Sequence, residues 1–185
     1  MNLADQLLAI HASLTEGGVE HAFGGAIALA YWVEDPRGTN DIDVNVFAAQ
    51  ENCERILAAL PDGVAYADDD VATIKRDGQT RLWWDGTPID LFFSNLPIHD
   101  EAARHSSEVP FEGVRVPILG PAELALFKAI FDRTQDWADI EAMLLAQTLD
   151  AVALRDRLVE FLGEEDQRLA RLDESISRAS RAESR

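Results

Sequence analysis

Residues 41–47 read DIDVNVF, a run in which acidic or polar residues alternate with apolar ones. Successive side chains of a β-strand point to opposite faces, so this alternation predicts a strand. On such a strand Asp41 and Asp43 project from one face, while Ile42 and Val44 face apolar packing on the other. The run therefore predicts two carboxylates held side by side.

Neighbouring carboxylates repel each other, and this raises the pKa of each unless a positive charge neutralises them. Mg²⁺ suits the position because it takes hard oxygen ligands, typically one or two carboxylates plus substrate phosphates. The alternative for a bare Asp-x-Asp is a pair of solvated carboxylates on an exposed sheet face.

A third acid, Asp90, lies in the apolar strand candidate at residues 87–93, TPIDLFF. An unpaired charge buried in such a strand would be costly. If this strand neighbours the first, Asp41, Asp43 and Asp90 form a triad that can hold two metal ions about 4 Å apart. Asp90 would then also be placed to help remove a proton from an attacking hydroxyl.

Gly24 and Gly25 stand between a strand candidate at residues 19–23 and a helix candidate at residues 26–33. Without side chains, the backbone here can approach a phosphate closely, and the helix N-terminus supplies N–H donors. The order of strand, Gly-Gly, helix, loop and carboxylate strand therefore favours a phosphate-binding turn beside the acids.

The rest of the chain predicts an α+β (mixed α/β) fold. A mixed sheet with flanking helices is expected over residues 1–120, and a C-terminal helical bundle packed on this core over residues 121–185, with the last residues disordered. Asp77-Gly78 predicts a hairpin turn. The expected helices are residues 2–16, 50–60, 98–105, 121–132, 134–147, 150–162 and a segment from 164, and the further strands are residues 70–76, 79–84 and a hairpin within 108–118.

The length, cysteine content and charge of the chain argue against several classes of protein. The 185 residues suffice for one sizeable core with a helical annex. The only cysteine, Cys53, excludes a disulfide framework and a cysteine-rich zinc site, and fits a cytoplasmic protein. The apolar runs are too short for a membrane span, so no membrane partner is expected. A net charge of −18 argues against general coating of nucleic acid.

The motif set resembles a known superfamily. Phe23-Gly24-Gly25, the Asp41–Asp43 strand and Asp90 are similar to the signature of DNA polymerase β-like nucleotidyltransferases. Arg37, Thr39, Asp41 and Asp43 match more narrowly the Arg-x-Thr-x-Asp-h-Asp string (h is hydrophobic) of the AbiEii/AbiGii toxin nucleotidyltransferases and their MenT-type relatives. A later helical motif, residues 126–133 followed by residues 136–139, resembles the same family more loosely.

The resemblance implies Mg²⁺-dependent transfer of a nucleoside monophosphate from a nucleoside triphosphate such as ATP to a hydroxyl acceptor. Asp41, Asp43 and Asp90 would be the catalytic and metal-binding residues. It also implies roles outside this triad: Gly24 and Gly25 at the phosphates, Lys128 at the triphosphate, Arg37 and Thr39 in nucleotide binding, and Asp136 and Asp139 as structural residues or in orienting Lys128.

Lys128 is a candidate phosphate-binding residue even without the resemblance, because it is one of two lysines in an acidic chain. The apolar stripe of its helix consists of Leu124, Phe127, Ile130 and Phe131, which puts Lys128 at or beyond the edge of the buried face. A surface lysine without a function is the alternative.

Several functions stay open at this point. The family suggests a toxin of a bacterial toxin–antitoxin system, with tRNA as acceptor and an antitoxin protein as partner. A small-molecule acceptor, as in antibiotic-modifying relatives, a protein acceptor, and a catalytically degenerate nucleotide-binding or interaction module are alternatives. A metal phosphohydrolase is disfavoured because the four histidines share no metal-binding spacing.

Two weaker candidate groups remain. Lys75, Arg76 and Arg81 flank the expected Asp77-Gly78 turn, where a solvated hairpin is favoured over contact with phosphate or RNA. Trp83 and Trp84 should point to opposite faces of their strand, and packing or plain surface exposure is favoured over stacking on a base.

Overall fold

The structure is a computed structural model that describes residues 1–183. It has the mixed α/β fold that the sequence predicts, and the chain divides into two compact units. Unit 1 comprises Met1–Ile27 and Gly38–Leu119, and unit 2 comprises Ala28–Arg37 and the chain from Gly120 onward. The expected domain boundary at residue 120 stays a prediction, and unit 2 additionally takes up residues 28–37.

Unit 1 is built on a mixed six-stranded sheet with the order β3-β4-β2-β1-β6-β5. The neighbours β2 and β4 are parallel, as are β1 and β6, and the other pairs are antiparallel. The strands are β1 (His21–Phe23), β2 (Ile42–Ala49), β3 (Gln79–Trp84), β4 (Thr87–Ser94), β5 (Ser107–Phe111) and β6 (Val114–Ile118).

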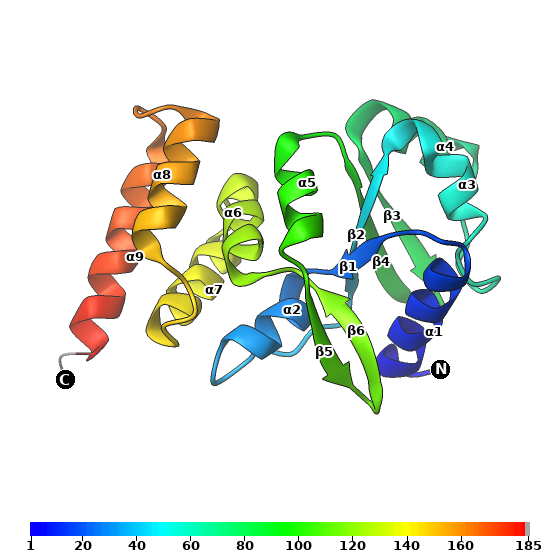
Figure 1. Ribbon diagram of the computed structural model, residues 1–185, viewed down its shortest axis with the longest axis horizontal. Coiled ribbons are helices and arrows are strands. Elements are labelled where there is room, and N and C mark those ends of the chain that lie inside the picture. The colour runs from blue at the N-terminus through cyan, green and yellow to red at the C-terminus, as the bar shows by residue number, and fades with distance from the viewer. Residues whose placement is uncertain (184–185) are drawn as a thin grey trace. The chain divides into compact units, whose positions relative to one another are not determined.

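One face of this sheet is covered by helices α1, α3 and α4, while α5 lies on the other side (Figure 1). Apolar side chains that alternate along the strands, such as Ile42, Val44 and Ile89, are fully buried. The intervening residues of β2 and β4 belong to the opposite face. The helices are α1 (Leu3–Glu16), the 3₁₀ turn η1 (Gln50–Asn52), α3 (Cys53–Leu57), α4 (Asp68–Asp77) and α5 (Pro97–Arg104).

The strand expected at residues 70–76 is wrong, because this segment is the helix α4. Its first turn carries acidic residues and its last turn carries basic residues, which favours a helix through its macrodipole. Asp70 also accepts a hydrogen bond from the N–H of Ala67. Gly78, with φ +70°, ends the helix in the left-handed conformation rather than turning a hairpin. The hairpin lies one strand later, where Asp85 and Gly86 join β3 to β4 with positive φ.

Unit 2 is helical, as the sequence predicts for the C-terminal region. Within it α7 packs against α6 and α9, and α8 packs against α6 and α9. Pro121 occupies the first turn of α6, a position where its missing N–H costs nothing. The last residues, for which the sequence predicts disorder, are helical up to Glu183, and Ser184 and Arg185 lie outside the described residues. The helices are α6 (Pro121–Phe131), α7 (Thr134–Leu145), α8 (Ala151–Leu162) and α9 (Gln167–Glu183).

The helix α2 (Gly25–Trp32) begins in unit 1 and ends in unit 2. Among residues 1–183, no helix is both long and apolar enough to cross a bilayer.

Candidate active site

The register of β2 and β4 brings two of the predicted acids together. The strands are parallel neighbours, and Asp43 lies directly opposite Asp90. Opposite residues of adjacent strands point to the same face, so both carboxylates project from the face away from Ile42 and Ile89. Asp41 immediately precedes β2 and is two residues before Asp43. The sequence-based expectation that the two acid-bearing strands are neighbours is therefore confirmed.

The glycine pair touches this acidic strand. The N–H of Gly24 donates to the carbonyl oxygen of Asp43 over 2.9 Å. Gly25 has φ +52°, and a Cβ placed on it would lie 1.7 Å from the Asp43 carboxylate oxygen Oδ2. A Cβ on Gly24 would lie 2.7 Å from the Asn45 amide nitrogen. Only glycines therefore allow the start of α2 to lie so close to the Asp43 side chain.

Thr39 lies next to the first acid. Its hydroxyl donates to the carboxylate of Asp41, and it is also close to the Asp41 backbone. This contact orients Asp41, while the nucleotide-binding role expected of Thr39 stays a prediction.

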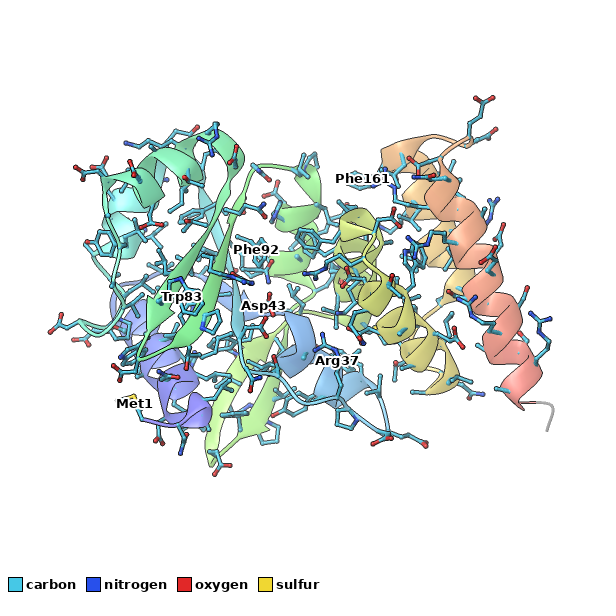
Figure 2. All side chains as sticks on the ribbon, turned by 180° about the vertical axis from the view of Figure 1, so that it is seen from behind. Met1, Arg37, Asp43, Trp83, Phe92 and Phe161 are labelled. Carbon is cyan, nitrogen blue, oxygen red and sulfur yellow. The ribbon has the colours of Figure 1, made fainter. Side chains whose placement is uncertain are left out.

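An arginine that the sequence interpretation placed at a solvated turn belongs to this site. Arg81 lies on β3 opposite Asp90, and its guanidinium donates two hydrogen bonds of 2.6 Å to the Asp90 carboxylate. Arg81 is two residues before Trp83, so the two side chains share one face of the strand that precedes Asp90. This spacing is the sequence signal that could have placed Arg81 at the site. Trp83 is 51% exposed, whereas Trp84 is buried, so the expected opposition of the two rings is confirmed (Asp43 and Trp83 are labelled in Figure 2).

The carboxylates of unit 1 fit a divalent cation by their chemistry, since they offer hard oxygen ligands on one face beside a glycine cradle. They do not yet form a closed ligand set. Among residues 1–183, no three Asp, Glu, His or Cys side chains are grouped closely enough to hold one metal ion. The carboxylate of Asp90 is engaged by Arg81 instead.

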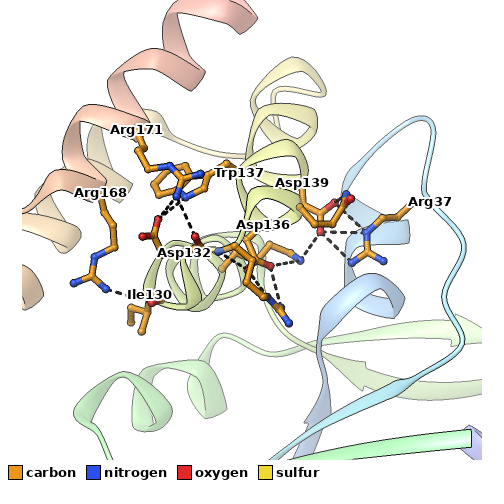
Figure 3. Close-up of polar contacts among 11 residues, drawn as sticks. Arg37, Ile130, Asp132, Asp136, Trp137, Asp139, Arg168 and Arg171 are labelled. Carbon is orange, nitrogen blue, oxygen red and sulfur yellow. Dashed lines mark hydrogen bonds and ion pairs between the residues drawn. The ribbon is translucent and has the colours of Figure 1, made fainter.

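The remaining predicted site residues belong to a charged cluster in unit 2 (Figure 3). The ammonium of Lys128 donates to Asp139 over 2.7 Å and lies 3.8 Å from Asp136. Arg37 bonds Asp139 through its guanidinium at 3.1–3.3 Å, and Arg133 bonds Asp136 at 2.7 Å. The two acids of α7 thus hold both basic residues that the family resemblance assigns to the nucleotide.

The expectation that Lys128 lies at or beyond the edge of the buried face is wrong. Lys128 is 4% exposed, while Phe131, expected in the buried stripe, is 41% exposed. Burial alone would raise the pKa of Asp139, but hydrogen bonds from Arg37 and Lys128 outweigh it and lower that pKa. Lys128, Asp136 and Asp139 therefore form the buried centre of an ion network whose two arginines are partly exposed. The triphosphate-binding role of Lys128 and Arg37 stays a prediction.

The sequence of the chain matches one protein family along nearly its whole length. A profile of the family described as nucleotidyl transferase AbiEii toxin, type IV toxin–antitoxin system, matches residues 6–185. No protein of curated function matches the chain in sequence.

Three solved structures share the fold of this chain. The crystal structure of ANT(2'')-Ia with adenylyl-2''-tobramycin has a TM-score of 0.62 at 13% identity, covering 85% of this chain and 95% of that chain. The solution structure of the antibiotic-resistance factor ANT(2'')-Ia gives 0.58 at 15% identity, with 85% and 90% covered. A protein of H. pylori described as a nucleotidyltransferase gives 0.50 at 16%, with 95% and 91% covered. At these identities the likeness shows the fold alone.

Proposed function

We propose that this chain, which belongs to the AbiEii family of nucleotidyltransferase toxins of type IV toxin–antitoxin systems, uses Mg²⁺ to move a nucleoside monophosphate from a nucleoside triphosphate to a hydroxyl acceptor. Asp41, Asp43 and Asp90 are the residues that would hold the metal ions. The observation that carries the proposal is the register of Asp43 opposite Asp90, with the Gly25 backbone against the Asp43 carboxylate.

The proposed reaction is an in-line displacement at the α-phosphorus. The acceptor hydroxyl oxygen forms a bond to this phosphorus, the bond to the bridging oxygen of the β-phosphate breaks, and pyrophosphate leaves. Asp90 accepts the proton of the attacking hydroxyl. Gly24 and Gly25 let the α2 N-terminus approach the phosphates, where its backbone dipoles favour negative charge. When bound, Mg²⁺ would supply positive charge that lowers the pKa of the acceptor hydroxyl and offsets charge on the α-phosphate.

The acceptor proposed first is tRNA, which the resemblance of the motifs implies. An antitoxin protein is the proposed partner, because the family is one of toxins of type IV toxin–antitoxin systems. The net charge of −18 favours a second candidate, a small cationic molecule with hydroxyl groups, over a long polyanion. The structure of ANT(2'')-Ia with an adenylylated tobramycin shows that this fold hosts such an acceptor in another protein.

The proposal is tested by label transfer. The full chain is incubated with each α-labelled nucleoside triphosphate and Mg²⁺, in parallel with total RNA, a hydroxyl-rich polyamine and total protein. We expect label in one acceptor and equimolar pyrophosphate, both lost in Asp41→Asn and Asp43→Asn. Asp62→Asn is the matched control, because it removes an exposed carboxylate outside the site.

Transfer that persists in Asp41→Asn or Asp43→Asn would refute the site. Triphosphate binding with no transfer to any acceptor would favour the degenerate nucleotide-binding module. Release of inorganic phosphate without pyrophosphate would indicate a phosphohydrolase instead.

A further inference from the structure

The ion pair between Arg81 and Asp90 occupies a carboxylate that the proposed reaction needs. The guanidinium is bidentate, with both hydrogen bonds at 2.6 Å, and the two residues are opposite each other on β3 and β4. The Asp90 side chain is 15% exposed, so the arginine satisfies a largely buried charge. A bidentate charge-assisted pair of this kind fixes the orientation of the carboxylate.

Arg81 also lies within the electrostatic field of the other two acids. The pKa of its guanidinium is raised, first by the hydrogen bonds and charge of Asp90 and then by the charges of Asp41 and Asp43. It therefore serves as a counter-ion to all three carboxylates, although it bonds directly to only one of them.

The same contact opposes the binding of a metal ion to Asp90. A guanidinium and a divalent cation compete for the same carboxylate lone pairs, and their like charges repel at short distance. While Arg81 holds Asp90, a metal ion can bind this carboxylate only by displacing the guanidinium. The Arg81 side chain is 52% exposed, so its guanidinium can move from Asp90 into water at a small cost in free energy.

We propose that Arg81 is the resident counter-cation of Asp90, and that divalent ions bind in two unequal steps, the first at Asp41 and Asp43 and the second only as Arg81 leaves Asp90. The proposal rests on the metal site of the proposed function and adds an order of binding to it. Arg81 is thus a positioning residue that sets the metal concentration at which Asp90 joins the site.

The test measures Mn²⁺ binding to the full chain by calorimetry and by the electron paramagnetic resonance signal of free Mn²⁺, without nucleotide. Wild-type protein should show a tighter and a weaker class of site. Arg81→Gln should tighten the weaker class about five- to tenfold, because a competing charge is removed, and change the tighter class less than about twofold. Arg81→Lys keeps the positive charge but cannot donate two parallel hydrogen bonds to the carboxylate. The affinity of its weaker class should therefore lie between those of wild type and Arg81→Gln.

Arg76→Gln is the matched control. Arg76 forms a similar pair with its neighbour Asp77 and belongs to the same unit, but the residue that raises its pKa is Asp77 and not a predicted metal ligand. Its loss removes the same charge and should leave both Mn²⁺ affinities within about twofold of wild type. In an Asp90→Asn background, Arg81→Gln should change the remaining affinity less than about twofold, because the carboxylate for which the ions compete directly is absent.

Unchanged or weaker Mn²⁺ binding in Arg81→Gln would overturn the inference, and so would equal tightening in Arg76→Gln. Thermal unfolding of each variant separates these outcomes from misfolding. If wild-type protein binds no Mn²⁺ that Asp41→Asn or Asp43→Asn abolishes, the proposed metal site itself is wrong and the inference falls with it. Intact wild-type binding without an Arg81 effect refutes the inference alone.

Discussion

Replacing Gly25 by alanine should abolish nucleotidyl transfer while leaving the protein folded. Gly25 has φ +52°, and the added Cβ would lie 1.7 Å from Oδ2 and 2.5 Å from Cγ of Asp43. Forcing a residue with a Cβ into the left-handed conformation costs about 1–2 kcal/mol. At this chain length that corresponds to a fall in Tm of about 2–8 °C. The overlap involves the end of a side chain, so Asp43 can relieve it by rotating its carboxylate out of the proposed metal site.

Transfer should therefore fall at least about 100-fold, as expected when a positioned group of a metal or charge-stabilising site is displaced. Gly18→Ala separates the two effects. Gly18 has a similar φ of +63°, but nothing lies within 4 Å of its added Cβ. It should lose the same stability and keep its activity. Label transfer and thermal unfolding are measured on both variants, and full activity in Gly25→Ala, or an equal loss in Gly18→Ala, would refute the reasoning.

Three further predictions concern stability. Burial lowers the pKa of His21 below its ordinary 6.5 despite its hydrogen bond to the Val19 carbonyl, so the unfolded state takes up the proton first and the unfolding free energy should fall as pH drops below about 6.5. A chemical denaturation series from pH 8 to 5 should show a smaller fall in His21→Asn, and an equal fall would contradict the assignment. Lys128→Met should lower stability by about 3 kcal/mol in urea titrations, because Asp139 loses a buried partner and keeps Arg37; an unchanged midpoint would rule out the buried network. Gly63→Ala would set a Cβ 2.0 Å from the indole nitrogen of buried Trp84, and should cost about 1–3 kcal/mol by overpacking, whereas an unchanged Tm would show that the indole moves freely.

The parts of the fold that sequence reasoning predicted are those with a strong local pattern. Period-two alternation around Asp43 identified β2, and the apolar run around Asp90 identified β4. The order of strand, Gly24-Gly25, helix and acidic strand placed the glycine turn beside the acids. These predictions are correct because one face of each strand is fully buried. A shift of one residue would move the buried side chains to the other face of the sheet.

The segment of α4 was misread because Asp77-Gly78 has two meanings. The same dipeptide suits a two-residue hairpin turn and the left-handed end of a helix, and the short charged segment before it has little apolar periodicity. The acids at its start and the basic residues at its end were the signals that decide for a helix.

The burial of Lys128 and the pairing of Arg81 were beyond the sequence for a different reason. A charged residue is normally assigned to the surface, and its burial becomes favourable only when its partners are known. Asp139 lies 11 residues from Lys128 and Arg37 lies 102 residues from Asp139. Arg81 meets Asp90 through the register of a hairpin whose turn had been placed one strand too early. Helical periodicity and strand alternation describe one element at a time and contain no such long-range pairing.

Crystals grown with Mn²⁺ and a non-hydrolysable nucleoside triphosphate give the most direct measurement, the position of Mn²⁺ from its anomalous scattering. We predict Mn²⁺ bound by the carboxylates of Asp41 and Asp43, with Asp90 turned from Arg81 toward the metal. Mn²⁺ bound elsewhere, or triphosphate bound with no metal at these carboxylates, would contradict the account.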